Sequence, residues 1–320
     1  MRARSLKIFI SIGVSLLILG ALYWKIDIAN IKNILAQVDV PVLTGALLIL
    51  IPTTLLSALR FRMLLSGKNK PSLGVATKLI LASATMNAVL PSKMGDMLKS
   101  VFMRDALDMR GSFAVSIVVF EKACDLLGLL IWCLLGLVVY AGDDDFFTLL
   151  TLAIGGGLGF GILMLSSLSF ADWILRLISK IAPSSLADKF ENLRKSWAEV
   201  HGFFWRSKIT VMNIVGITLI IWFLYLFQIW LLTVALNTQV PQLISFGLSS
   251  LALLAGLAPL TFAGVGTRDA ATIYFFAPFM TAPAGAALGL LITLRNVLTG
   301  LAGLPFLNKY INMLRQKSHS

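Results

Sequence analysis

The chain has 320 residues, of which 58% are hydrophobic and only 13% are charged, and its mean hydropathy is +0.89. Water-soluble domains are about 45–50% apolar and about 25% charged, so this composition excludes a soluble globular protein and indicates a membrane protein. The formal net charge of +12 would suggest nucleic acid as the partner of a soluble chain. In a membrane protein, basic loops on the cytoplasmic side explain it, and we expect no nucleic-acid partner.

The two cysteines and two histidines give little basis for metal or disulfide chemistry. Cys124 and Cys133 lie in one apolar segment, about 13 Å apart along a helix and on opposite faces. His201 and His319 are isolated in the sequence. The sequence therefore predicts no metal, no cofactor and no disulfide.

Apolar segments long enough to cross a bilayer occur six times along the chain. The first follows Arg2, Arg4 and Lys7 and has no obvious small-residue cleavage site near its end, so we interpret it as a membrane span and not as a signal peptide. The predicted spans cover residues 8–24, 41–59, 113–140, 146–166, 209–236 and 283–307. The second span is expected to be followed by a basic loop that contains Arg60, Arg62, Lys68 and Lys70.

Two further apolar segments are interrupted by polar residues and glycines. Residues 73–90 run into a polar stretch from Pro91 to Asp96, and an amphipathic stretch follows. Residues 243–258 run into Pro259 and a glycine-containing stretch, and a second apolar stretch follows. Each pattern predicts a helical hairpin with a broken tip, over residues 73–104 and 243–280; full membrane crossings are the alternative. If both segments are hairpins, the basic segments fall on one side of the membrane and the Asp143–Asp145 run falls on the other, as the positive-inside rule requires.

The predicted fold is an all-α polytopic membrane protein with six spanning helices and two opposed re-entrant hairpins. Both termini are expected on the cytoplasmic side of the inner membrane. Residues 1–145 and 146–320 place spans and hairpins in the same order with opposite orientation, which indicates an inverted repeat within one membrane domain, residues 1–320. Residues 171–208 have apolar positions at helical spacing and are expected to form interfacial helices; a docking surface for a soluble enzyme is the alternative.

Three charged residues occur in the middle of the predicted span 113–140. Glu121, Lys122 and Asp125 share an arc of about 100° on a helix, and Glu121 lies about 12 Å from the helix start. A lipid-facing charge at this depth costs about 3 kcal/mol or more, so all three must face protein or water. They form either a functional, switchable ionic network or an ion pair that only fixes helix packing.

The hairpin tips and the last span supply further polar residues. We expect an anionic substrate to be bound by Asn87, Pro91, Lys93, Gly95, Asp96, Lys99, Gly264, Gly266, Arg268, Asp269 and Arg295. Cations exceed acids among the buried and tip charges, and broken-helix N-termini add positive potential, which favours an anion. Snorkelling of Lys93, Lys99 and Arg268 to lipid headgroups is the alternative.

Two other patterns have simpler interpretations. The glycines between Gly155 and Gly161 resemble a nucleotide-binding loop, but they lie in an apolar span and predict close helix packing. The Asp143–Asp145 run is interpreted as a solvated loop end, with a divalent metal site or the acidic motif of a glycosyltransferase as alternatives.

Four stretches in order resemble the lysylphosphatidylglycerol synthase transmembrane-region family, also called the flippase-like domain, over nearly the whole chain. They are Ala58-Leu59-Arg60-Phe61-Arg62, Asn87-x-x-Leu90-Pro91-x-x-x-Gly95-Asp96, Glu121-Lys122-x-x-Asp125 and Ala263-Gly264-Val265-Gly266-Thr267-Arg268-Asp269. Lys122 stands where the family usually has arginine, Ala263 replaces the first glycine, and Asp269 replaces the usual glutamate. The sign of each charge is kept, although a lysine cannot grip phosphate through a planar fork.

The resemblance implies a flippase part, to which multidomain members add a soluble aminoacyl-transferring domain. Because the chain ends at Ser320, shortly after the last predicted span, we do not expect that enzymatic activity. We expect flippase-like translocation or binding of an anionic phospholipid or a lipid-linked, polyprenyl-phosphate substrate. The alternatives are a non-catalytic membrane subunit or partner of a glycosyltransferase or lipid-modifying enzyme, and a small-solute secondary transporter.

Overall fold

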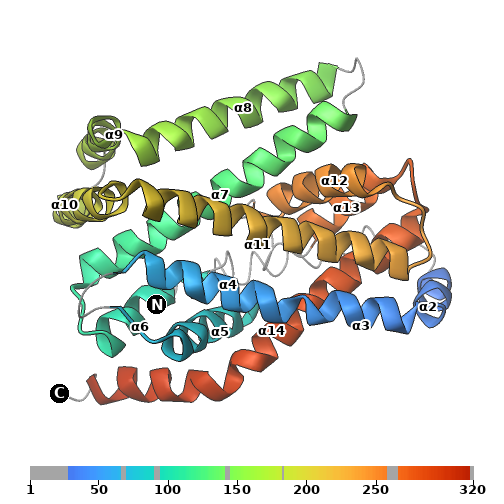
Figure 1. Ribbon diagram of the computed structural model, residues 1–320, viewed down its shortest axis with the longest axis horizontal. Helices are drawn as coiled ribbons and strands as arrows, with labels where there is room; N and C mark the ends of the chain where they lie inside the picture. Colours follow the sequence, from blue (N-terminus) through green and yellow to red (C-terminus); the bar gives the residue numbers. More distant parts are fainter. Residues whose placement is uncertain are drawn as a thin grey trace.

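The computed structural model describes residues 28–65, 70–89, 94–140, 145–181, 184–257 and 266–317. Within these ranges the chain is all-helical, without strands (Figure 1). The first predicted span, residues 8–24, lies outside the described residues. The same holds for the predicted tip residues Pro91, Lys93 and Gly264.

The helices follow one another with short connections. In chain order they are α2 (Ile28–Ala36), α3 (Val40–Leu48), α4 (Leu50–Met63), α5 (Leu73–Val89), α6 (Met94–Ala106), α7 (Gly111–Tyr140), α8 (Asp145–Ser166), α9 (Leu168–Ile181), α10 (Ser184–Trp205), α11 (Lys208–Ala235), α12 (Gln242–Ala255), α13 (Thr267–Phe276) and α14 (Ala282–Lys317).

Five helical stretches among the described residues are long and apolar enough to cross a membrane. They are Val40–Met63, Gly111–Val139, Asp145–Ser166, Lys208–Ala235 and Ala282–Leu307. They confirm the polytopic all-α fold and match five of the predicted spans. The first of the five extends beyond its predicted end at residue 59, because the helix continues through Arg60 and Arg62. The prediction that these two arginines belong to a basic loop was wrong.

The spanning helices run between two ends of the molecule. In Figure 1, α4 runs opposite to α11, and α7 runs opposite to α14. One end contains α9 and α10 together with the last turns of α4 and α14. At the other end, the backbone amide of Asp39 donates to the carbonyl of Ala235 over 2.9 Å. The side-chain amide of Asn237 donates to the backbone carbonyl of Gln37, also over 2.9 Å.

The two predicted hairpins are present as helix pairs, α5–α6 and α12–α13. Since α4 ends and α7 begins at the α9–α10 end, the first hairpin starts and finishes there; the second starts and finishes at the opposite end. In the first pair, the side-chain oxygen of Asn87 accepts from the backbone amide of Asp96 over 3.2 Å. A Cβ at Gly95 would collide with the α5 backbone at Ser83 and Asn87, so glycine permits the close approach of the two helices.

The first helix of each hairpin packs on a spanning helix of the other half of the chain, as an inverted repeat requires. Helix α5 packs on α14 while α12 packs on α7, and α6 packs on α7 while α13 packs on α14. Glycines mediate both cross-contacts: a Cβ at Gly303 would collide with the carbonyl of Leu81, and a Cβ at Gly136 would collide with Gly247. These contacts support the inverted repeat. The predicted boundary between the halves at residue 145 stays a prediction.

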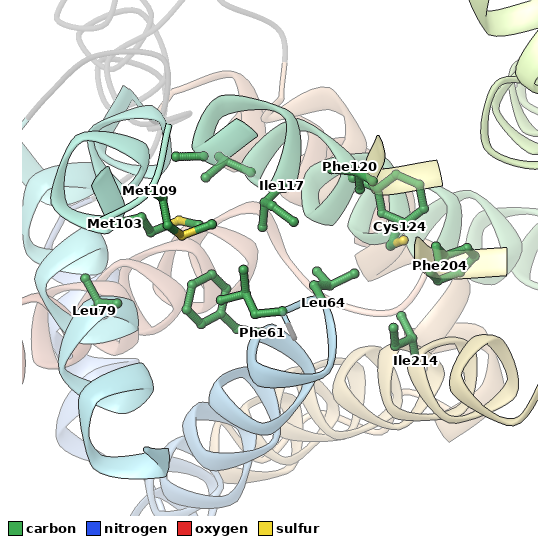
Figure 2. Packing of buried hydrophobic residues seen from close by; sticks show 14 of the residues in the cluster. Phe61, Leu64, Leu79, Met103, Met109, Ile117, Phe120, Cys124, Phe204 and Ile214 are labelled. Atoms are coloured by element: carbon green, nitrogen blue, oxygen red, sulfur yellow. The ribbon is translucent and has the colours of Figure 1, made fainter. Parts of the chain in front are cut away.

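The largest apolar cluster lies at the α9–α10 end and joins the first hairpin to α4, α7 and α10 (Figure 2). Within this cluster, the ring centroid of Phe120 lies 4.7 Å from that of Phe204 and 5.5 Å from that of Trp197. Helix α10 is therefore packed onto α7 through its apolar face. The predicted interfacial segment thus divides into one helix that joins the core and one, α9, that leaves apolar side chains exposed.

Helix α9 keeps Trp173, Leu177 and Ile181 exposed, as a helix in a membrane interface would. It is linked to α10 by Arg194, whose guanidinium contacts Asp172 over 2.5 Å and Glu191 over 2.7 Å. The hydrogen bond from Arg194 lowers the pKa of the Glu191 carboxyl. The interfacial location stays a prediction.

The glycines of α8 serve helix packing where they meet α7. A Cβ at Gly161 would come within 2.5 Å of the Leu127 side chain, and one at Gly157 would touch Leu130. This arrangement supports the packing interpretation over the nucleotide-loop interpretation.

The orientation in the membrane can be tested by thiol labelling in intact cells, after Cys124 and Cys133 have been replaced by alanine. We expect new cysteines at Lys70 and Arg176, near the α9–α10 end, to be protected from a membrane-impermeant reagent, because basic segments stay cytoplasmic. A cysteine at Asp145, at the start of α8, should be labelled. Labelling at Arg176 together with Asp145 would contradict the two-hairpin topology.

Candidate functional site

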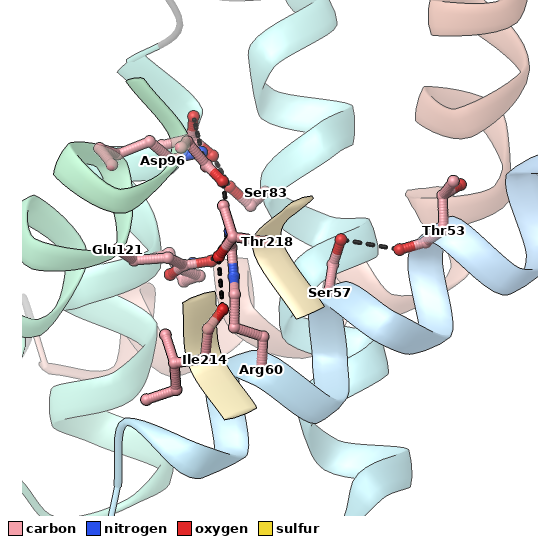
Figure 3. Close-up of polar contacts among 11 residues, drawn as sticks. Thr53, Ser57, Arg60, Ser83, Asp96, Glu121, Ile214 and Thr218 are labelled. Carbon is pink, nitrogen blue, oxygen red and sulfur yellow. Dashed lines mark hydrogen bonds and ion pairs between the residues drawn. The ribbon is translucent and has the colours of Figure 1, made fainter. Parts of the chain in front are cut away.

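The charged residues of α4, α6 and α7 form one connected ionic network. Figure 3 shows three of its members, Arg60, Asp96 and Glu121. Arg60 lies one turn before the end of α4, where its guanidinium contacts Asp125 over 2.5 Å and Glu121 over 3.5 Å. It also donates to the hydroxyl of Thr218 over 3.1 Å. Since Arg60 is 2% exposed, these partners replace the water that a buried guanidinium would otherwise need.

Lys99 of α6 forms the innermost contact of the network. Its ammonium pairs with the second carboxylate oxygen of Glu121, and the two side chains are 1% and 2% exposed. The ring of Phe61 lies 4.8 Å from the ammonium and adds a cation–π contact. Snorkelling of Lys99 to the headgroups is therefore wrong for this conformation.

Lys122 and the two aspartates form the outer part of the network. The Lys122 ammonium lies 3.0 Å from an oxygen of Asp96 and 3.0 Å from an oxygen of Asp125. Asp96 also accepts from the hydroxyl of Ser83 over 3.0 Å. The predicted pairing of Lys122 with Asp125 is present, but it is one contact within a larger network of three cations and three carboxylates.

The network borders a cavity of about 540 Å³ between α4, the first hairpin, α7, α11 and α14. Four cationic and three acidic side chains line it: Arg60, Lys99, Lys122 and Arg295, with Asp96, Glu121 and Asp125. Hydroxyl, amide and aromatic side chains complete the polar lining: Thr53, Thr54, Ser57, Ser83, Asn87, Trp222, Tyr225, Asn296 and Thr299. One positive charge is therefore in excess on the wall.

Arg295 carries this excess charge. Its Nε donates to the side-chain oxygen of Gln228 over 2.6 Å, and an Nη donates to that of Asn296 over 3.0 Å. The guanidinium stacks over the Tyr225 ring at 3.7 Å. All of these partners are neutral, and no carboxylate among the described residues pairs with Arg295. A charge-assisted partner, such as a phosphate, would therefore find a prepositioned guanidinium here.

Arg268 and Asp269 of the second hairpin form a separate buried pair. The Nε of Arg268 donates to Asp269 over 2.9 Å, and an Nη donates to the Thr293 hydroxyl of α14 over 2.7 Å. The other oxygen of Asp269 accepts from the backbone amide of Gly266 over 3.1 Å, and Gly266 has a φ of 104° that favours glycine. This pair holds α13 against α14.

The structure brings together most of the predicted site. Asn87, Asp96, Lys99, Glu121, Lys122, Asp125 and Arg295 all line the cavity. Gly95, Gly266, Arg268 and Asp269 are not part of this lining. The predicted phosphate contact of Arg268 stays a prediction, although its guanidinium already binds protein partners in this conformation.

Sequence reasoning missed Arg60, Gln228, Thr218 and Tyr225. Arg60 was assigned to a loop because it precedes three further basic residues, although it belongs to the first resembling stretch. Gln228 is fully buried in α11, where it also donates to the carbonyl of Ala46 over 2.8 Å. A glutamine in the middle of an otherwise apolar span was the available signal for this residue.

The fold and the site define a polytopic α-helical membrane protein with a charged cavity bordered by the first of two opposed hairpins. A family model described as "Lysylphosphatidylglycerol synthase TM region" matches residues 8–303. The chain belongs to this family. A comparison with curated proteins found no match. The chain is thus a multi-pass membrane protein related to lipid handling.

Proposed function

We propose that the chain binds the headgroup of an anionic phospholipid or a polyprenyl-phosphate lipid in the cavity and moves it across the cytoplasmic membrane. Translocation of this kind needs a polar path for the headgroup, while the acyl or prenyl chains stay in the bilayer. It needs no covalent chemistry, so the proposal assigns no enzymatic step to the chain.

The observation that carries the proposal is that Arg295, a charged residue at the cavity, has only neutral partners among the described residues. Its guanidinium is half-buried in a span, borders a cavity, and has neutral partners in Gln228, Asn296 and Tyr225. A permanently charged group at this depth is unfavourable unless something compensates it. A phosphate on the cavity side would supply that compensation through two parallel hydrogen bonds.

The size and the lining of the cavity agree with a lipid headgroup. Its volume of about 540 Å³ falls within the range of about 300–1,000 Å³ that is typical of small-molecule sites. Leu50, Leu126 and Leu129 provide apolar wall next to the charged residues. A single anionic headgroup would neutralise the excess positive charge of the lining.

The opposed hairpins agree with translocation between two sides of the membrane. Transporters built from inverted repeats place their sites near the middle of the bilayer and alternate access by moving one half against the other. The exchanged packing of α5 on α14 and α12 on α7 provides two equivalent sets of contacts for such a motion.

A liposome assay tests the proposed function directly. Purified protein is reconstituted in phosphatidylcholine vesicles that contain a trace of phosphatidylglycerol or phosphatidylcholine with the same fluorophore. A membrane-impermeant reductant quenches the fluorescent lipids in the outer leaflet. The further loss of fluorescence from lipids of the inner leaflet then measures translocation. We expect faster loss for phosphatidylglycerol than in empty vesicles, and little change for phosphatidylcholine.

A second arm with a fluorescent polyprenyl phosphate separates the two lipid classes of the proposal. Equal rates for anionic and zwitterionic probes would indicate unspecific scrambling. Rates no higher than those of empty vesicles for every anionic probe would contradict the proposed function.

A further inference from the structure

Lys122 is the most accessible charge of the ionic network. Its side chain is 41% exposed, whereas the Lys99 and Glu121 side chains are 1% and 2% exposed. It lines the cavity and bridges two helices, because Asp96 belongs to α6 and Asp125 to α7, the helix of Lys122 itself. A ligand in the cavity can therefore reach this ammonium without unfolding the network.

If the Lys122 ammonium moves away from Asp96 and Asp125, the two carboxylates retain different contacts. Asp125 retains the guanidinium of Arg60 at 2.5 Å. Asp96 retains the Ser83 hydroxyl at 3.0 Å, which belongs to α5 of the same hairpin. Loss of the Lys122–Asp96 contact therefore leaves the Ser83–Asp96 contact within the first hairpin intact, but it removes one of the two ion pairs that Asp96 and Lys99 form with α7.

The second ion pair between α6 and α7 would stay in place. Lys99 lies nearly one helical turn further along α6 than Asp96. Its pair with Glu121 also borders the cavity, but both side chains are almost completely buried, unlike that of Lys122. The start of α6 would thus lose its charged contact with α7, while the helix further along stays anchored.

We propose that an anionic headgroup in the cavity forms an ion pair with the Lys122 ammonium and thereby breaks the Lys122–Asp96 ion pair. The start of α6 can then move away from α7. The inference rests on the proposed function and adds to it the residue that links binding to movement. Two electrostatic effects act together: the headgroup attracts Lys122, and it repels the carboxylate of Asp96. Because Asp96 lies beside the cavity, water can solvate it after release.

Binding of the headgroup in the cavity should not loosen the second hairpin in this conformation. Its equivalent contact, from Arg268 to Asp269 and Thr293, is buried and is not part of the cavity lining. Binding would therefore loosen one hairpin and leave the other closed, which is what a transporter needs to open toward one side at a time.

Distances between spin labels in nanodiscs test this inference, in protein whose Cys124 and Cys133 are replaced by alanine. One pair of labels joins Met97 of α6 to Leu135 of α7, and a reference pair joins Tyr274 of α13 to Leu290 of α14; all four positions are exposed. Nanodiscs of phosphatidylcholine are compared with nanodiscs that also contain phosphatidylglycerol. We expect phosphatidylglycerol to raise a longer-distance population of the first pair by roughly fivefold or more, with no change in the reference pair.

Variants separate the Lys122–Asp96 contact from general effects of charge. Asp96→Asn should show the longer-distance population in phosphatidylcholine alone, because the contact is already weakened. Lys122→Arg keeps the contact and should behave like wild type in phosphatidylcholine. Asp145→Asn makes the same chemical change at an exposed position of α8 and should have no effect.

Two results would overturn the inference. One is an unchanged first pair in Asp96→Asn, because the contact would then not hold α6; this arm needs no lipid ligand. The other is phosphatidylglycerol that binds without changing the first pair, or that changes both pairs equally. Absence of any phosphatidylglycerol binding to wild type is a different outcome, and it would remove the proposed function and this inference together.

Discussion

Replacing Glu121 by glutamine should destabilise the protein by about 3–5 kcal/mol, the cost of leaving a buried charge without its partner. Glu121 is the only carboxylate among the described residues that pairs with Lys99, and it also contacts Arg60. Neither cation can turn to solvent, because both are nearly inaccessible. The free energy of unfolding, measured in one detergent for wild type and variant, checks this expectation.

Two controls make the result specific. Glu199→Gln removes the same charge from the exposed pair with Arg110 and should leave unfolding nearly unchanged. The double variant Lys99→Met, Glu121→Met removes both partners and should be more stable than Glu121→Gln, because no unpaired lysine remains. A Glu121→Gln protein as stable as wild type would show that the network is not a structural requirement.

Arg295→Lys should weaken the binding of anionic lipids by about 1.5–3 kcal/mol, the scale of a hydrogen bond to a charged group. Lysine keeps the positive charge but cannot form two parallel hydrogen bonds to a phosphate, nor stack on Tyr225 as a planar group. Binding of zwitterionic lipids should change little. Competition between headgroups, measured on both proteins in nanodiscs, gives the two affinities.

Arg268→Lys is the matched control for this variant, because it makes the same change at a buried arginine outside the cavity lining. It should lower stability without altering headgroup selectivity. If Arg295→Lys weakens the binding of anionic and zwitterionic lipids equally, Arg295 stabilises the structure, and the proposal that it contacts a phosphate is wrong. If Arg268→Lys loses anionic selectivity, the phosphate contact expected from the sequence applies to Arg268 after all.

Much of the fold follows from hydropathy and charge alone. The apolar runs located five of the described spans, because a bilayer requires about 20 apolar residues for each crossing. The interrupted runs around Pro91 and Pro259 located both hairpins, and the sidedness of the basic segments predicted that the hairpins are opposed. What these signals could not give was the packing of α10 onto α7, because an amphipathic face does not reveal which surface covers it.

The site could be predicted only in part, for a physical reason. Depth in an apolar span identified Glu121, Lys122, Asp125 and Arg295, since charges there must face a polar interior. Depth says nothing about pairing between helices. Arg60 pairs with residues of α7 that lie far away in the sequence, and it sits near the end of its span, where an arginine is usually explained by the membrane interface.

The exchanged packing of the two halves has a consequence for energy as well as for shape. A conformation in which the second hairpin loosens and the first closes would contain the same kinds of helix contacts, with α13–α14 and α6–α7 in reversed roles. If the two conformations bury similar areas, a small differential affinity for a ligand suffices to shift the population between them. Near-equal energies of the two conformations would then allow the protein to alternate between them without a large external driving force.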